Sequence, residues 1–155
     1  QLDVSQTTMR GCTVADNAIG GGAVISSGRN VGLYTSIFDQ PGVASISLFD
    51  SATATVGYVL AADLDGLPVQ NDIMQGSPLY VDAAGGDYHL QRTSPGVDFA
   101  PHGGGTDLDR QPRDVDLGDI LNVFGPRDLG EFEIQTQLPG SCYGADTVFC
   151  DGFDG

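Results

Sequence analysis

Four aspartates lie close together in the chain and have the chemistry to hold a cation: Asp107, Asp109, Asp114 and Asp116. Carboxylate oxygens are the ligands that calcium prefers in proteins, so calcium is the cation we expect this segment to bind. The spacing matches no EF-hand loop, which needs a glycine at its sixth position and a glutamate at its twelfth. The four residues are therefore a candidate calcium site of irregular geometry.

The other residue types that carry chemistry match no common catalytic motif. His89 and His102 stand apart from other metal-binding residue types, so we expect no zinc site. There is no lysine to reach a phosphate, no G-x-G-x-x-G and no G-x-S-x-G elbow. Sugar hydrolysis needs two or three converging carboxylates, and the chain has no Asp-Asp pair. We therefore predict no catalytic residue and no required cofactor, with calcium as the one candidate.

The chain is strongly acidic. Its 155 residues include nineteen Asp, two Glu, six Arg and no Lys, which gives a formal net charge of −15. Nucleic-acid binders need basic surfaces, and anionic membranes repel acidic proteins, so both partners are disfavoured. No run of eighteen apolar residues exists, so we expect no membrane span. Aspartate is also a common turn residue, and the length suits one domain, so the composition fits a loop-rich β fold.

The three cysteines are Cys12, Cys142 and Cys150. We expect a disulfide between Cys142 and Cys150, which enclose a short segment; closing so small a loop contributes about 2.5 kcal/mol in the chain-entropy model. A disulfide implies an oxidising, extracytoplasmic compartment, and it leaves Cys12 free or bonded outside this sequence. Three reduced thiols in a cytosolic protein are the alternative, which the absence of any C-x-x-C spacing disfavours.

Short apolar stretches alternate with polar residues, as expected of β-strands. In Ser45 to Leu48 and Ala52 to Tyr58, apolar or small residues occupy one face and Ser or Thr the other, which we expect to face water. Apolar residues also recur at an offset of 22 residues, about one coil of a solenoid. The matched positions are Val24 with Ile46, Tyr34 with Val56, Ile37 with Val59 and Val81, and Tyr58 with Tyr80.

The second half of the chain contains different signals. Pro78 to Asp82 and Tyr88 to Gln91 are predicted strands, and the Gly and Asp residues between them suit a tight reversal. Leu129 to Ile134 alternates and is predicted as a closing strand. Asp116 to Phe124 has apolar residues at helical spacing, with an N-cap aspartate and a following Gly-Pro, so we expect a short helix covering the open end of the solenoid.

A series of motifs in this half resembles the end of secreted and surface-anchored bacterial right-handed parallel β-helix proteins, a segment called the choice-of-anchor Q domain. The matching residues are Ser77–Asp82, Gly86–Gln91, Ser94–Asp98, Asp107–Asp109, Pro112–Arg113 and Asp128–Glu133. Arg110 stands where the family has glycine, and residues 114 to 124 are an insertion. Asp146 to Asp154 is similar to the "DxIFxDGFE" motifs that end many exported proteins of Gram-negative bacteria. The resemblance implies a secreted or cell-surface β-helix.

We therefore predict an all-β, right-handed parallel β-helix. Residues 1–98 are its coils of about 22 residues, residues 99–137 its capping segment and residues 138–155 a disulfide-pinned tail. No charged and apolar leader precedes Gln1, so we expect a processed chain or a piece of a longer one. The expected function is a non-catalytic structural or adhesive module, with glycan or a second copy stacked into a filament as partner. A calcium-assisted polysaccharide lyase, a hydrolase or a glycan-binding module is the alternative.

Overall fold

The structure, a computed structural model, describes residues 7–135 of the chain. Strands dominate this part, and the one helical element is a 3-10 turn, η1 (Ala83–Gly85). No helix in these residues is both long and apolar enough to cross a membrane. The strands are β1 (Thr7–Arg10), β2 (Thr13–Ala15), β3 (Ala23–Ser27), β4 (Val31–Asp39), β5 (Ala44–Leu48), β6 (Ala54–Ala61), β7 (Ile73–Gln75), β8 (Tyr80–Asp82) and β9 (Asp87–Leu90).

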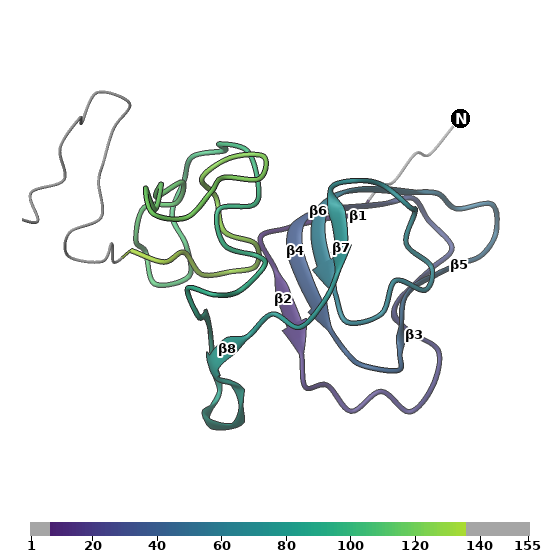
Figure 1. The fold of residues 1–155 in the computed structure, drawn as a ribbon. Coiled ribbons are helices and arrows are strands. Elements are labelled where there is room, and N and C mark those ends of the chain that lie inside the picture. The colour runs from purple at the N-terminus through teal and green to yellow at the C-terminus, as the bar shows by residue number, and fades with distance from the viewer. Residues whose placement is uncertain (1–6, 136–155) are drawn as a thin grey trace, which may run out of the picture.

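Two parallel sheets form the first half of the molecule (Figure 1). In the larger sheet, β4 lies between β6 and the pair β1 and β2, and β7 follows β6 at the edge. In the smaller sheet, β3 pairs with β5. The strands predicted at Ser45 to Leu48 and Ala52 to Tyr58 are confirmed as β5 and β6.

The predicted 22-residue register is wrong in detail. Thr7 pairs with Val31 at an offset of 24 residues, Val31 with Ala54 at 23 and Ile25 with Ile46 at 21. The offset differs between layers because the connecting turns differ in length. It follows that Leu33, and not Tyr34, lies opposite Val56, and that Ile37 lies opposite Leu60 in place of Val59.

The predicted continuation of this register to Tyr80 and Val81 is also wrong. The strand beside β6 is β7, whose Ile73 pairs with Val59 at an offset of only 14 residues. β8 pairs antiparallel with β9 in a separate hairpin, with Gly86 in a left-handed conformation at its turn. The reversal expected between the two predicted strands is thus confirmed, but this hairpin adds no layer to the parallel sheet.

Apolar side chains fill the space between the two parallel sheets. Val31, Leu33 and Phe38 of β4 and Val56 and Val59 of β6 are almost completely buried there. Ile46 of β5 joins them from the smaller sheet. These β-branched and aromatic residues form the inner core, which matches the expectation that one face of each strand points inward. Ser45 was expected to face water, but it is 1 % exposed because its hydroxyl donates to the Asp63 carbonyl at 2.6 Å.

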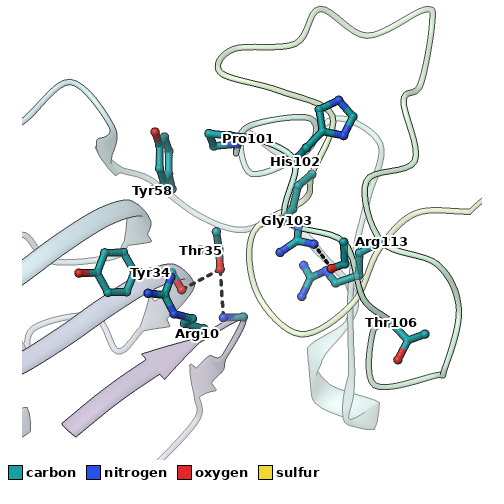
Figure 2. A pocket seen from close by; sticks show the side chains of 12 residues that line it. Arg10, Tyr34, Thr35, Tyr58, Pro101, His102, Gly103, Thr106 and Arg113 are labelled. Atoms are coloured by element: carbon teal, nitrogen blue, oxygen red, sulfur yellow. Dashed lines mark hydrogen bonds between the residues drawn. The ribbon is translucent and has the colours of Figure 1, made fainter. Parts of the chain in front are cut away.

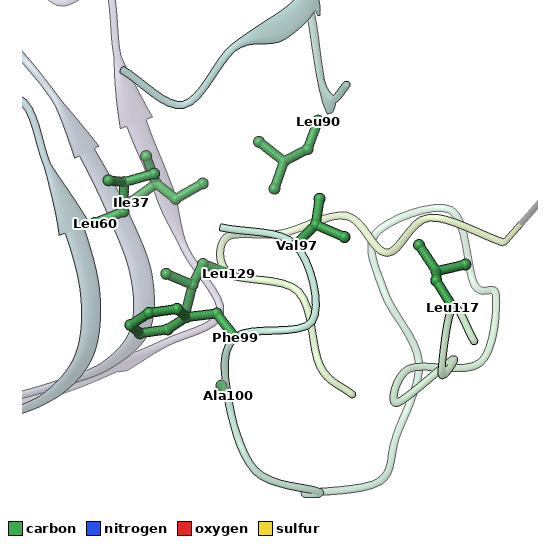
Figure 3. Packing of buried hydrophobic residues seen from close by; sticks show 8 residues of the cluster. All are labelled: Ile37, Leu60, Leu90, Val97, Phe99, Ala100, Leu117 and Leu129. Carbon is green, nitrogen blue, oxygen red and sulfur yellow. The ribbon is translucent and has the colours of Figure 1, made fainter. Parts of the chain in front are cut away.

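The outer face of the larger sheet is buried as well. Ile37 of β4 and Leu60 of β6 point away from the inner core and pack against Val97, Phe99 and Leu129 of the second half of the chain (Figure 3). We call residues 94–135 the covering unit. Parallel sheets are commonly buried on both faces, and here this unit supplies the second layer.

A row of left-handed residues bends the strands of the larger sheet. Gly11, Thr35 and Tyr58 have φ values of 58°, 50° and 56°, and the register of β1, β4 and β6 places them side by side. An extra residue of this kind shifts the alternation of a strand. As a result Leu33 and Phe38, five positions apart, both face the inner core.

The covering unit is made of loops. Two isolated bridges, Ala100 with Arg127 and Thr106 with Pro112, are its only strand-like pairings. The predicted strand at residues 129–134 and the predicted helix at residues 116–124 are both wrong. Leu117 is buried while Leu121 is 88 % exposed, so the helical spacing does not produce one buried face. The unit lies beside β2 and β4, against the flat of the sheet and not over an open end (Figure 1).

Replacement of Gly130 by alanine should loosen the covering unit from the sheet. The residue has φ 86°, and an added Cβ would lie 2.6 Å from Thr13 Oγ1 and 2.9 Å from Ile37 Cδ1. We expect a loss of about 3 kcal/mol in urea unfolding, from backbone strain plus overpacking. The control is Gly42→Ala, with φ 76° and open space around it, which should lose only about 1 kcal/mol. Equal losses would contradict this packing.

Candidate functional site

A pocket of about 320 Å³ opens where the bent strands meet the covering unit (Figure 2). One wall comes from the row of left-handed residues and their neighbours, and the other from the loop after Phe99 together with two arginines. The lining residues are Arg10, Gly11, Tyr34, Thr35, Tyr58, Pro101, His102, Gly103, Gly104, Thr106, Arg113 and Arg127. Its volume lies at the lower end of the usual range for small-molecule sites, about 300–1,000 Å³.

The strand wall presents an arginine on an aromatic ring. The Arg10 guanidinium carbon lies 4.0 Å from the centre of the Tyr34 ring, which is within the range of a cation–π contact. Arg10 is exposed and makes no ion pair within residues 7–135. Thr35 Oγ1 accepts the Gly11 N–H at 3.1 Å, which fixes the backbone that follows β1 against β4. The Arg10 charge is therefore held in place and open to a ligand.

The opposite wall holds two arginines that are fixed by the covering unit. Arg113 donates to the Gly130 and Asp128 carbonyls at 2.9 Å and 2.8 Å. Arg127 donates from Nε to Asp114 Oδ1 at 2.6 Å and from Nη2 to the Gly104 carbonyl. Its Nη1 lies beside Gly103 and has no hydrogen bond within the described part of the chain. These bonds orient both cations, and each is paired with a carboxylate that does not itself line the pocket.

The pocket concentrates positive charge in an acidic protein. Three of the six arginines line it, and among the described residues that line it none is Asp or Glu. Asp114 and Glu133 lie behind the arginines, where they fix the guanidinium groups. A concave site of one sign with low-dielectric walls attracts small ions of the opposite sign. This geometry therefore favours an anionic ligand.

A second hollow, of about 500 Å³, continues along β1 and β2. It shares Arg10, Gly11, Thr106 and Arg113 with the pocket, but Asp107 and Glu131 also line it. We call it the side groove. Its mixed charge makes it less suited to an anion than the pocket, so the two hollows can hold chemically different parts of one extended ligand.

Buried carboxylates hold the loops that carry the pocket arginines. Asp98, Asp107, Asp128 and Glu133 are each at most 8 % exposed. Their oxygens accept backbone N–H groups at 2.8–3.3 Å from Asp98, Gln111, Val115, Leu117, Asp128, Glu133 and Ile134. The loops satisfy part of their N–H groups with backbone carbonyls, and these side chains accept others in the absence of a strand ladder. We call the four residues the carboxylate network.

Burial makes several of these groups weaker acids. It raises the pKa of Asp98 to about 7, of Asp128 to about 6 and of Glu133 to about 7, and their mutual repulsion adds to the effect. Asp98 Oδ1 and Arg113 Nε are buried without a hydrogen-bond partner among the described residues. Arg113 Nε still lies 3.5 Å from Glu133 Oε2, so it partly balances the network's charge.

The four aspartates expected to bind calcium have separate protein partners. Asp107 belongs to the carboxylate network, and Asp109 lies 2.9 Å from His89 Nε2. Asp114 pairs with Arg127 and accepts the Gly103 and Gly104 N–H groups, and Asp116 lies near Asn122. Within residues 7–135, no three His, Cys, Asp or Glu side chains are grouped as metal ligands. The geometry gives the calcium hypothesis no support.

The remaining residues whose side chains could act as ligands, bases or nucleophiles lie apart from one another. His89 lies between Asp87 at 2.6 Å and Asp109, and its ring stacks on Phe132, so it ties β9 to the covering unit. His102 is 77 % exposed at the pocket rim. Cys12 is a free thiol. The predicted Cys142 to Cys150 disulfide and the tail motif lie outside the described residues.

The pocket arginines were missed in the sequence because they are far apart in the chain. Arg10 precedes the first bend, and Arg113 and Arg127 flank the insertion. One signal could have pointed to them: the chain has six arginines and no lysine, and three of the six, Arg110, Arg113 and Arg127, fall in the predicted capping segment.

The comparisons with known proteins identify no relative. No protein-family model matches the chain, and neither a curated protein nor a solved structure matches it. The resemblance to the choice-of-anchor Q domain therefore stays a prediction, and the function must be argued from the geometry.

The carboxylate network predicts that the protein is more stable at pH 5 than at pH 8. The pKa values of Asp98, Asp128 and Glu133 in the folded state lie above the unfolded value of about 4. Between about pH 4 and pH 7 the folded state therefore binds more protons than the unfolded state. Their contribution is fully present below about pH 4 and is lost as pH rises through 6 and 7. We expect Tm to fall by about 3 °C or more from pH 5 to pH 8, which corresponds to about 1 kcal/mol.

The Glu133→Gln variant is the control for this dependence. It should be less stable at pH 5, because an amide nitrogen cannot accept the second N–H, and its pH profile should be flatter. A Tm that rises from pH 5 to pH 8 in the parent protein would show that these carboxylates are not desolvated as described.

Proposed function

We propose that the protein is a non-catalytic extracellular adhesive module, built as a right-handed parallel β-helix with a covering unit on one face. Parallel strands recur at offsets of 21 to 24 residues in two facing sheets, which supports a solenoid of short coils. The extracellular setting rests on the sequence resemblance and on the cysteine pairing expected in the tail. The bacterial surface is the location that fits both.

The cationic pocket is the observation that carries the adhesive role. Two of its arginines, Arg113 and Arg127, are held by hydrogen bonds to carbonyls and a carboxylate, and its other polar groups are hydroxyls, the His102 imidazole and backbone atoms. Fixed cations beside aromatic rings suit recognition of a ligand, because ordering them costs little entropy on binding. A pocket of this kind on a rigid sheet attaches the protein to a partner surface.

A polysaccharide lyase is the second candidate, because His102 at the pocket rim could take a proton from a bound sugar. Proton abstraction requires a base within hydrogen-bond reach of that proton. His102 is 77 % exposed and lies 3.8 Å from Asp114, so nothing fixes its ring tightly over the pocket. The geometry therefore favours binding over turnover.

A binding and turnover test separates the two candidates. We expect the protein to be retained on surfaces coated with acidic polysaccharide, and to produce no new reducing ends or unsaturated products with or without calcium. The neutral polysaccharide surface is the control and should retain less protein. Turnover that is lost in Asp107→Ala or Asp109→Ala would overturn the proposal in favour of a calcium-assisted enzyme.

Stacking into a filament is a further part of the proposed structural role. Among the described residues β1 and β2 pair only with β4, so their other edge is available for strand addition. A second copy that adds its last strand there would make a head-to-tail contact. We expect filaments in electron micrographs and a large native mass at high protein concentration. Monomers alone at that concentration would contradict this part.

A further inference from the structure

We propose that the pocket binds a carboxylate-bearing sugar, a hexuronate unit of an acidic glycan, with its carboxylate between Arg10 and Arg127. This inference rests on the proposed adhesive function and names the ligand class of that site. Arg10 supplies a guanidinium that has no ion pair in the described part of the chain, and Arg127 supplies Nη1 from the opposite wall. Guanidinium groups match the planar, bidentate geometry of a carboxylate.

The rest of the lining suits a sugar ring better than a bare inorganic anion. Tyr34 and Tyr58 bring aromatic surface to the strand wall, and Thr35 and Thr106 bring hydroxyl groups. Aromatic rings provide an amphipathic surface with few rotatable bonds, which suits a ligand with both C–H and O–H faces. Figure 2 shows Tyr58 across from Pro101, with Arg10 beside Tyr34 on the strand side and Arg113 on the loop side. A phosphate ion would leave this aromatic surface unused.

The side groove sets an expectation for the neighbouring sugar. Asp107 and Glu131 line it, so a second carboxylate placed there would be repelled, whereas a neutral sugar would find hydrogen-bond acceptors. The two hollows share Arg10 and Gly11, so an oligosaccharide that leaves the pocket enters the groove directly. We therefore expect an alternating glycan, acidic then neutral, to bind more tightly than a chain of uronates.

Titration with matched oligosaccharides tests the ligand class. The probes are a hyaluronan tetrasaccharide, in which glucuronate alternates with a neutral amino sugar, trigalacturonate, the methyl esters of both, and inorganic phosphate. We expect esterification to weaken binding about tenfold, which is about 1.4 kcal/mol, because the ester loses its charge-assisted hydrogen bonds to the guanidinium groups. The tetrasaccharide should bind more tightly than trigalacturonate and phosphate. Equal affinity for acid and ester, no binding of either acid, or phosphate as tight as the sugars would overturn the proposal.

Variants of two arginines locate the site. Arg10→Gln should weaken binding of the tetrasaccharide about tenfold and leave Tm nearly unchanged, because Arg10 is exposed. Arg29→Gln is the matched control, since Arg29 is also exposed and does not line the pocket; its affinity should equal that of the parent. Tyr34→Ala, which removes the ring beneath Arg10, should also weaken binding.

The two proposals fail in different ways. If Arg10→Gln binds the tetrasaccharide as well as Arg29→Gln does, the pocket assignment is wrong even if the parent protein still adheres to polysaccharide surfaces. If adhesion fails while the tetrasaccharide binds in an Arg10-dependent manner, the adhesive function is wrong and the pocket assignment stands.

Discussion

The structure depends on backbone N–H groups in irregular loops being satisfied by buried carboxylates. Ile37 and Leu60 give the larger sheet a second apolar face, which must be covered. The covering unit does this with loops, whose N–H groups cannot pair in a ladder. Asp98, Asp128 and Glu133 accept those groups at distances of 2.8–3.3 Å. Each of these buried N–H groups would destabilise the folded state by about 1–3 kcal/mol if it had no acceptor. The folding of the covering unit therefore depends on the carboxylate network.

The same network gives the acidic protein its cationic pocket. Arg113 lies between Glu133 on one side and the carbonyls of Asp128 and Gly130 on the other, so it joins the network to the pocket wall. Asp114, which lies outside the network, fixes Arg127 through a separate ion pair. Neither carboxylate lines the pocket, so the fully charged side chains that face it are guanidinium groups. Binding at the pocket and stability of the cover are therefore coupled through these two arginines.

Local patterns in the sequence predicted the strands but not the loops. Alternation identified β5 and β6, because those strands bury one face against the other sheet. The predicted register was wrong because the connecting turns differ in length, which alternation within a strand does not encode. Left-handed residues at Thr35 and Tyr58 also interrupt the alternation within their strands, and nothing in those residue types marks a bend. The helical spacing of Leu117 and Leu121 was misleading, because Leu117 packs into the core while Leu121 is 88 % exposed. Arg10 and Arg127 meet only through tertiary structure, which no local pattern encodes.

Native-state amide hydrogen exchange measures the dependence on buried carboxylates most directly. The amides of Val115, Leu117 and Ile134, which donate to Glu133, Asp98 and Asp128, should exchange as slowly as those in the middle of β4 and β6. Such protection in loops without regular structure requires the hydrogen bonds to the carboxylates to persist until the covering unit unfolds locally. Exchange of these three amides at the rate of exposed loop residues would contradict the account, because the cover would then not be held by the carboxylate network.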